Sequence, residues 1–145
     1  MTAWREVELA HPDFARRVRE RFDAHKHKVM ATLRRDGSPR ISGIEAEFAR
    51  GEIRLGMMPG SFKVSDLKRD PRLALHSGTE DPNDQPGAVV DAKVSGLAIE
   101  KKRRPHPSFA IDVREVVLIS VGDPPDHLVI ETWHEGRGLR RTKRY

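Results

Sequence analysis

The segment from Gly56 to Lys63 combines residue types that bind anions. Its sequence is GMMPGSFK: a strand pattern stops there, a turn follows, and Ser61 and Lys63 fall in the first turn of a predicted short helix. Free backbone N–H groups at a helix start, a hydroxyl and an ammonium group together attract negative charge. The sequence therefore predicts an anion site, and a phosphate-bearing cofactor is the first ligand to test.

Neighbouring residues extend this predicted site. Arg40, Ser42 and Ile44 alternate along a predicted strand. If that strand pairs with the next one, Arg40 or Ser42 projects towards the same anion and completes a phosphate cradle. Met57 and Met58 offer backbone groups and soft side chains to a flat ring, but Met57 follows the buried alternation of its strand, so we expect it to fill the core.

The sequence nominates no catalytic residue. No Gly-x-Ser-x-Gly elbow surrounds a serine, and neither a Walker motif nor a dinucleotide-binding glycine motif occurs. His25 and His27 would share a strand face, but no acidic ligand cluster accompanies them, so we expect no metal site. Glu45 and Glu47 also share a strand face, where they are either paired carboxylates for acid–base chemistry or ordinary exposed strand charges.

Hydrophobic periodicity predicts mainly β structure with short helices. The predicted helices span about residues 12–24 and 61–70, and a long exposed loop covers 78–90. The predicted strands span 29–33, 40–48, 53–57, 73–76, 92–99, 113–121 and 128–133, with 109–112 starting a separate short element. The connections between the first three strands, 29–33, 40–48 and 53–57, are too short for crossovers, so these three form an antiparallel meander. The pattern favours a closed or partly closed antiparallel barrel, with a large cofactor outside it where two subunits meet.

Composition narrows the class of protein. The 145 residues suit one domain, 1–145, without cysteine, a signal-peptide core or an apolar run of membrane-spanning length, so we expect a cytoplasmic protein. The net charge of +5 is concentrated in Lys101–Arg104 and in five basic residues of 137–144; the rest has 18 basic and 22 acidic residues. These clusters are solvated or attract phosphate ligands, nucleic acid or acidic partners. No aromatic residue interleaves 101–104, so stacking on nucleic acid is not expected.

Three ordered segments carry a resemblance to a known family. They are 31–42 (ATLRRDGSPRIS), 55–63 (LGMMPGSFK) and 66–75 (DLKRDPRLAL), followed near the end by 131–138 (ETWHEGRG). In order and spacing, from about residue 27 to 77, the chain resembles the pyridoxamine 5'-phosphate oxidase-like FMN-binding split-barrel superfamily. The resemblance implies a six-stranded split barrel and a homodimer with FMN at the interface, or the 8-hydroxy-5-deazaflavin coenzyme in its place.

The resemblance also implies roles for individual residues. Ser61 and Lys63 would hold the cofactor phosphate, and Arg40 and Ser42 would lie on the strand beside it. By the same resemblance, the ring system would be edged by Met57 and Met58, and the partner subunit's cofactor would be reached by Trp133 and Arg137.

Departures from the family pattern limit the expected activity. Phe62 stands where many members have a basic residue or tryptophan, and Glu45 would repel a phosphate if it faced the site. The Arg-Leu-His-Asp-Arg tail of true pyridoxamine phosphate oxidases is replaced by Gly138–Arg141, so that activity is not expected. We expect a flavin-dependent oxidoreductase of an unidentified small molecule. The alternatives are a deazaflavin-dependent reductase and a non-catalytic flavin- or haem-binding module.

Overall fold

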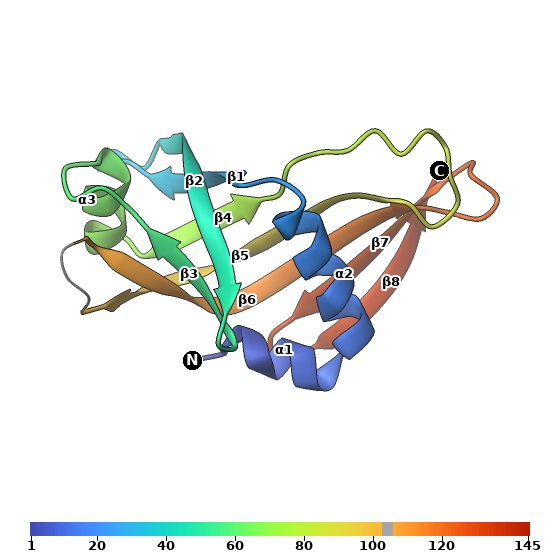
Figure 1. Ribbon diagram of the computed structural model, residues 1–145, viewed down its shortest axis with the longest axis horizontal. Coiled ribbons are helices and arrows are strands. Elements are labelled where there is room, and N and C mark those ends of the chain that lie inside the picture. The colour runs from blue at the N-terminus through green and yellow to red at the C-terminus, as the bar shows by residue number, and fades with distance from the viewer. Residues whose placement is uncertain (103–105) are drawn as a thin grey trace.

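The strands form one antiparallel sheet in the computed structural model, which describes residues 1–102 and 106–145 (Figure 1). In spatial order they are β3 (Glu52–Gly56), β2 (Pro39–Ala49), β1 (His27–Leu33), β4 (Arg72–His76), β5 (Val89–Lys101), β6 (Ser108–Val121), β7 (Leu128–His134) and β8 (Gly138–Arg144). Every pairing in this sheet is antiparallel, as the short connections predicted.

The long strand β6 closes the sheet into a barrel and also continues beyond it. At its first end, Phe109 pairs with Leu55 of β3, which closes the ring β3-β2-β1-β4-β5-β6. At its other end, Val116 pairs with Trp133 of β7, and β7 pairs in turn with β8. The result is a six-stranded barrel with a two-stranded extension, β7 and β8, that continues from β6. This confirms the predicted mainly β split barrel.

The core follows the alternation of the strands and the spacing of one helix. Ile53 and Leu55 of β3 are fully buried, whereas Arg54 between them is not. Phe14, Val18 and Phe22, four residues apart, are buried on the inner side of α2 (Pro12–Asp23). This confirms the helix predicted over 12–24.

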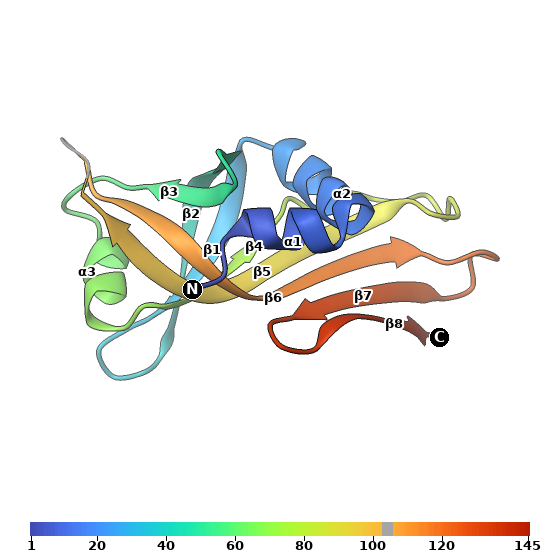
Figure 2. The same cartoon turned by 90° about the horizontal axis from the view of Figure 1, so that it is seen from below.

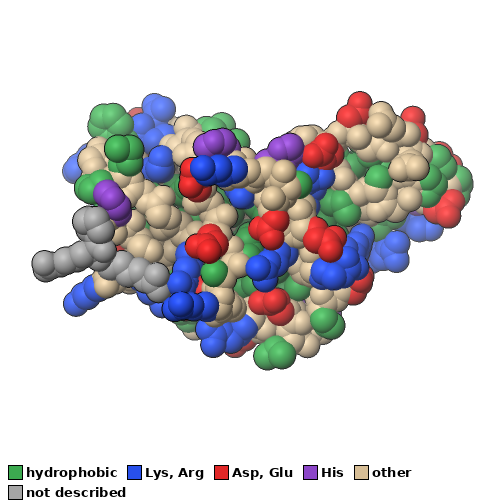
Figure 3. Space-filling view, in the orientation of Figure 1, with side chains coloured by type: hydrophobic (Ala, Val, Ile, Leu, Met, Phe, Trp, Pro, Cys, Tyr) green, Lys and Arg blue, Asp and Glu red, His purple; other side chains and the backbone are tan. Residues whose placement is uncertain are grey.

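Two helices cover the sheet where β6 leaves the barrel. α1 (Trp4–Ala10) and α2 lie on one side of β6 and β7 in Figure 2. Phe48 of β2 joins them to the barrel: its ring centroid lies 5.1 Å from that of Trp4 and 5.3 Å from that of Phe22. The outer side of α2 is polar, and Figure 3 shows acidic and basic side chains interleaved across the middle of this face.

The third helix lies at the end of the molecule away from β7 and β8 (Figure 1). α3 (Phe62–Arg69) packs Val64 and Leu67 into the core and contacts β1. It stops at Asp70, the residue before Pro71, because a residue followed by proline avoids helical geometry. The predicted helix after Ser61 is therefore confirmed.

Three expectations about the elements are corrected by the structure. Residues 109–112 belong to the continuous strand β6 and do not form a separate element. The C-terminal basic segment, for which no strand was predicted, forms β8, whose backbone pairs with β7. A helix, α1, precedes the first predicted one, so the described residues contain eight strands and three helices, against the seven and two expected.

Two further observations concern the remaining expectations. Of the predicted basic run, Lys101 ends β5 and Lys102 follows it, and Arg103 and Arg104 lie outside the described residues. Across the described part of the chain, no helix has the length and apolar character needed to span a membrane.

Candidate functional site

The start of α3 has unsatisfied hydrogen-bonding groups. Ser61 occupies the N-cap position, yet no side chain caps the first turn of the helix. The Ser61 backbone N–H donates to the Met58 carbonyl at 3.1 Å, which closes the preceding turn. The Ser61 Oγ is buried without a hydrogen-bond partner among the described residues. Buried polar groups normally have partners, so the Ser61 hydroxyl is one of the exceptions among the described residues, and it lies at a helix start without a side-chain cap.

Lys63 links this helix start to β2. Its Nζ donates to the Gly43 carbonyl at 3.2 Å. Within the described part of the chain, Lys63 forms no ion pair with a carboxylate, so its positive charge is not neutralised by a neighbour. A lysine held by a neutral carbonyl keeps its charge available for an anion.

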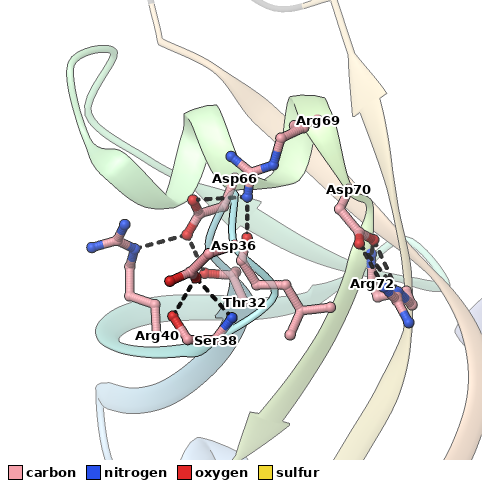
Figure 4. A network of polar contacts seen from close by, with 9 residues as sticks. Thr32, Asp36, Ser38, Arg40, Asp66, Arg69, Asp70 and Arg72 are labelled. Atoms are coloured by element: carbon pink, nitrogen blue, oxygen red, sulfur yellow. Dashed lines mark hydrogen bonds and ion pairs between the residues drawn. The ribbon is translucent and has the colours of Figure 1, made fainter.

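Arg40 is held beside the same helix by a buried carboxylate (Figure 4). Its Nε donates to the Asp66 Oδ2 at 2.8 Å, and the Thr32 hydroxyl donates to the same oxygen at 2.7 Å. Arg69 donates to the Asp66 Oδ1 at 3.3 Å and also to the Leu33 carbonyl. The Asp66 side chain is only 3% exposed. Four side chains from β1, β2 and α3 thus form one polar cluster, the Asp66 cluster: Thr32, Arg40, Asp66 and Arg69.

The charge of Asp66 is stabilised within this cluster. Burial raises the pKa of Asp66, but the hydrogen bonds from Arg40 and Thr32 outweigh it. The pKa of Asp66 therefore lies below its ordinary value, and the carboxylate is ionised at neutral pH.

Phe62 supports Arg40 from a second side. The Arg40 Cζ lies 5.1 Å from the centroid of the Phe62 ring, within the range of a cation–π contact. The terminal nitrogens of Arg40 donate no hydrogen bond to a described residue. Phe62 therefore does not supply the positive charge that a basic residue would bring to this position, but its ring contacts the guanidinium of Arg40.

A groove of about 280 Å³ opens beside Lys63. This Lys63 groove is lined by His27, Gly43, Ile44, Glu45, Gly56, Met57, Met58 and Lys63. A second hollow of about 450 Å³ shares Glu45 and Gly56 with it and is otherwise lined by polar residues and Ala46. The groove therefore brings together three of the residues predicted for the site, Met57, Met58 and Lys63.

The two methionines differ in their surroundings. Met57 is buried, and its backbone N–H donates to the Pro107 carbonyl at 3.2 Å, just before β6 begins. Met58 is largely exposed at the groove. Met57 therefore packs in the core while also bordering the groove, and Met58 is the freer of the two to contact a ligand.

Other predicted residues lie apart from the groove. Ser42 is half-buried on β2 and pairs with Met30 of β1. Trp133 is buried on β7 and Arg137 lies in the β7–β8 turn, both outside the six-stranded barrel. The structure does not bring these two to α3 within one subunit, so their assignment to a partner's cofactor stays a prediction.

Glu45 does face the Lys63 groove. Its carboxylate oxygen lies 3.5 Å from the Lys26 Nζ, so part of its charge is offset by a neighbouring cation. Within the described residues, no group of three or more His, Asp or Glu side chains is arranged to hold a metal ion.

Sequence reasoning assigned no role to Asp66. Its partners Thr32 and Arg40 lie on two strands, 34 and 26 residues away in the chain. A single aspartate within a short helix gives no sequence signal of such contacts. The cluster becomes apparent only when α3 is packed on β1 and β2.

Comparison with known proteins defines the fold. No protein-family model and no curated protein sequence matches this chain. Solved structures do match, at low identity, and they share the split barrel of pyridoxamine 5'-phosphate oxidase-like FMN-binding proteins. The chain has this fold, as the sequence resemblance implied.

Three of these structures show the range of proteins with this fold. A pyridoxamine 5'-phosphate oxidase-related, FMN-binding protein from Nostoc punctiforme has a TM-score of 0.64 and 10% identity, covering 93% of this chain and 96% of that one. PhzG from Burkholderia lata, in complex with tetrahydrophenazine-1-carboxylic acid, has a TM-score of 0.61, 13% identity and coverages of 95% and 88%. A haem-binding protein from Mycobacterium smegmatis has a TM-score of 0.56, 14% identity and coverages of 88% and 86%.

Proposed function

We propose that this protein binds FMN through its phosphate at the start of α3 and is a flavin-dependent oxidoreductase of a small molecule. The observation that carries the proposal is the start of α3: among the described residues the Ser61 hydroxyl has no hydrogen-bond partner, Lys63 follows in the first turn, and Arg40 contacts Phe62 of the same turn. The FMN-binding neighbour with the same fold supports it. Bound FMN supplies hydride or electron transfer, and the chain's own residues anchor the phosphate and orient the ring.

The Lys63 groove is the proposed space for the ring system, with Met58 and Met57 at its edge. At about 280 Å³ in one subunit, the groove lies just below the usual size range of small-molecule pockets, which begins near ~300 Å³. We propose that a second subunit covers this open groove and completes the site.

An exposed apolar face supports a homodimer. Val29 of β1 and Ile41 of β2 project from the outer face of the barrel, and Ile41 is 75% exposed. Together with Ala31 and Ala74 they border a shallow hollow of about 320 Å³. We propose that a second copy of the chain covers this face. Analytical ultracentrifugation of Ile41→Lys should then show a monomer where the unmodified chain is a dimer.

The test of FMN binding is a titration followed by visible absorbance and flavin fluorescence. Lys63→Ala should weaken FMN binding by at least ~10-fold, because a charge-assisted hydrogen bond contributes about 1.5–3 kcal/mol. Lys68→Ala is the matched control, since Lys68 lies on the same helix and points to Glu100 at 3.8 Å. Equal FMN affinity in both variants would contradict the phosphate assignment.

The 8-hydroxy-5-deazaflavin coenzyme is an alternative occupant, and the same titration with that coenzyme separates the two cofactors. Turnover of the bound cofactor with a chemical reductant and a small-molecule acceptor tests the oxidoreductase activity. A bound cofactor that never turns over would favour a binding module.

Haem is a second candidate for such a module. His27 and Met58 line the Lys63 groove, and both residue types bind haem iron. The haem-binding neighbour shares the fold. A Soret absorbance band that appears on adding haem and is lost in His27→Ala would favour haem over flavin.

A further inference from the structure

Asp66 is a buried acid whose contacts exceed what α3 needs for packing. Val64 and Leu67 already bury the inner side of this helix. Asp66 nevertheless accepts hydrogen bonds from three side chains, two of them on its Oδ2 and one on its Oδ1. Burying a carboxylate is costly, so three hydrogen bonds converging on one buried carboxylate point to a role beyond packing.

The geometry of the Arg40 contact suggests that reason. Asp66 accepts from the Nε of Arg40, the nitrogen nearest the side-chain stem, at 2.8 Å. The guanidinium is therefore fixed by its inner edge, and Figure 4 shows its two terminal nitrogens pointing away from Asp66. On another side the guanidinium contacts the Phe62 ring. An arginine contacted in this way keeps its two terminal nitrogens available, and their N–H groups match the geometry of a phosphate.

We propose that Asp66 is a positioning residue: it holds Arg40 so that both terminal nitrogens are presented to the phosphate of the bound cofactor. The proposal rests on the proposed function, because it assigns the phosphate to Arg40 at that site. Its physical basis is pre-organisation: an arginine already ordered loses less side-chain freedom when the phosphate binds. A purely structural Asp66 would instead only fasten α3 to β1, directly through Thr32 and indirectly by orienting Arg69 of the same helix towards the Leu33 carbonyl.

The experiment compares dissociation constants for FMN and for riboflavin, which lacks the phosphate. The ratio of the two constants isolates the phosphate contribution. It is measured for the unmodified chain, Asp66→Asn, Arg40→Met and the double variant. Glu131→Gln is the matched control, because Glu131 is also a buried carboxylate paired with an arginine at 2.8 Å, on β7.

Positioning predicts a specific pattern. Asp66→Asn lowers the FMN preference about tenfold and leaves riboflavin binding unchanged. In the Arg40→Met background the same change has no further effect on the ratio, and Glu131→Gln leaves the ratio as it was. An equal loss for both ligands, an undiminished effect without Arg40, or tighter FMN binding in Asp66→Asn would overturn the proposal.

A measurement without cofactor separates this proposal from the proposed function. The NMR signal of the Arg40 Nε–H should exchange slowly with water in the unmodified chain and rapidly in Asp66→Asn. An unchanged exchange rate would overturn the positioning role whatever the ligand. If the chain binds neither flavin, the proposed function fails and, with it, the presentation of Arg40 to a flavin phosphate. A slow-exchanging Nε–H would then show only that Asp66 holds Arg40.

Discussion

Two buried carboxylates in this molecule are paired with arginines in different ways. On β7, the Glu131 side chain, 11% exposed, accepts from a terminal nitrogen of Arg17 on α2 at 2.8 Å. On α3, Asp66 accepts from the Nε of Arg40 at the same distance. The first contact uses the end of the guanidinium and fastens α2 to the sheet. The second leaves that end without a hydrogen bond to a described residue. A carboxylate–arginine pair thus fastens a helix in one region and, in our proposal, prepares an arginine for a ligand in the other.

The surroundings of the two pairs also differ: the first pair lies in a well-packed region, and the second lies beside exposed groups. The α2 region is rich in aromatic packing, with the Trp4 and Phe22 rings each packed against Phe48. The α3 region instead has an exposed phenylalanine, Phe62, an unpaired hydroxyl on Ser61 and an open groove. We therefore expect changes near α2 to alter stability and changes near α3 to alter ligand binding.

The largest effect is expected in the α2 region. Phe22→Ala removes a fully buried ring and should lower the free energy of unfolding by about 3–5 kcal/mol. Urea denaturation followed by circular dichroism measures it, with Leu9→Ala, an exposed change on α1, as the control. FMN affinity of the folded variant should stay unchanged. A loss of FMN affinity without a loss of stability would contradict the expectation that changes near α2 alter stability and not ligand binding.

The second prediction concerns the pair on β7. Glu131→Gln should lower the free energy of unfolding by about 1–3 kcal/mol, because Arg17 is only 22% exposed and loses the nearer of its two carboxylate partners, keeping only Asp13 at 4.0 Å. Thermal denaturation measures the loss, and Arg16→Gln, which breaks exposed pairs on the same helix, serves as the control. If Glu131→Gln is no less stable than this control, the pair does not fasten α2.

A smaller effect is expected from the ring under Arg40. Phe62→Leu removes the cation–π contact, which contributes about 0.5–1 kcal/mol at an exposed site, so FMN binding should weaken roughly two- to fivefold. Stability should change little, because Phe62 is 73% exposed. Fluorescence titration measures the affinity, and Leu9→Ala, at another exposed apolar position on a helix, is the control. Unchanged affinity would show that Asp66 alone orders Arg40.

The smallest effect should appear in the dependence of stability on pH. Because the pKa of Asp66 in the folded chain lies below its unfolded value, Asp66 stabilises the fold above the unfolded pKa and loses this contribution as the pH falls through the folded pKa. Between neutral pH and about pH 3 the unmodified chain should therefore lose more stability than Asp66→Asn. Urea midpoints at each pH measure the difference. Asp84→Asn, in an exposed loop, should follow the unmodified chain, and parallel curves for all three would contradict the linkage.

Much of the fold follows from local patterns in the sequence. Phe14, Val18 and Phe22 specify α2 because their spacing matches one helical face, and the alternation around Leu55 specifies β3. β8 could not be predicted in this way: of its side chains only Leu139 packs against the core, and the strand exists because its backbone pairs with β7.

The candidate site divides in the same manner. Ser61 and Lys63 could be proposed from the sequence because a helix start combines them locally. Asp66 could not, because its contacts come from β1 and β2 and require the finished barrel. Likewise, the terminal nitrogens of Arg40 are available because Asp66 accepts from the Nε. The spacing of residues in the sequence does not specify which guanidinium nitrogen is used.

The shared strand β6 has a consequence for how the site is assembled. Residues that are proposed to hold the phosphate all lie between Arg40 and Lys63, but the loop before Ser61 is tied through Met57 to Pro107, at the start of β6. The seam where Leu55 meets Phe109 joins distant parts of the chain and costs loop-closure entropy. We therefore expect a ligand bound at this loop to stabilise the β3–β6 pairing as well, because a ligand that binds only the folded chain favours the closed ring of strands.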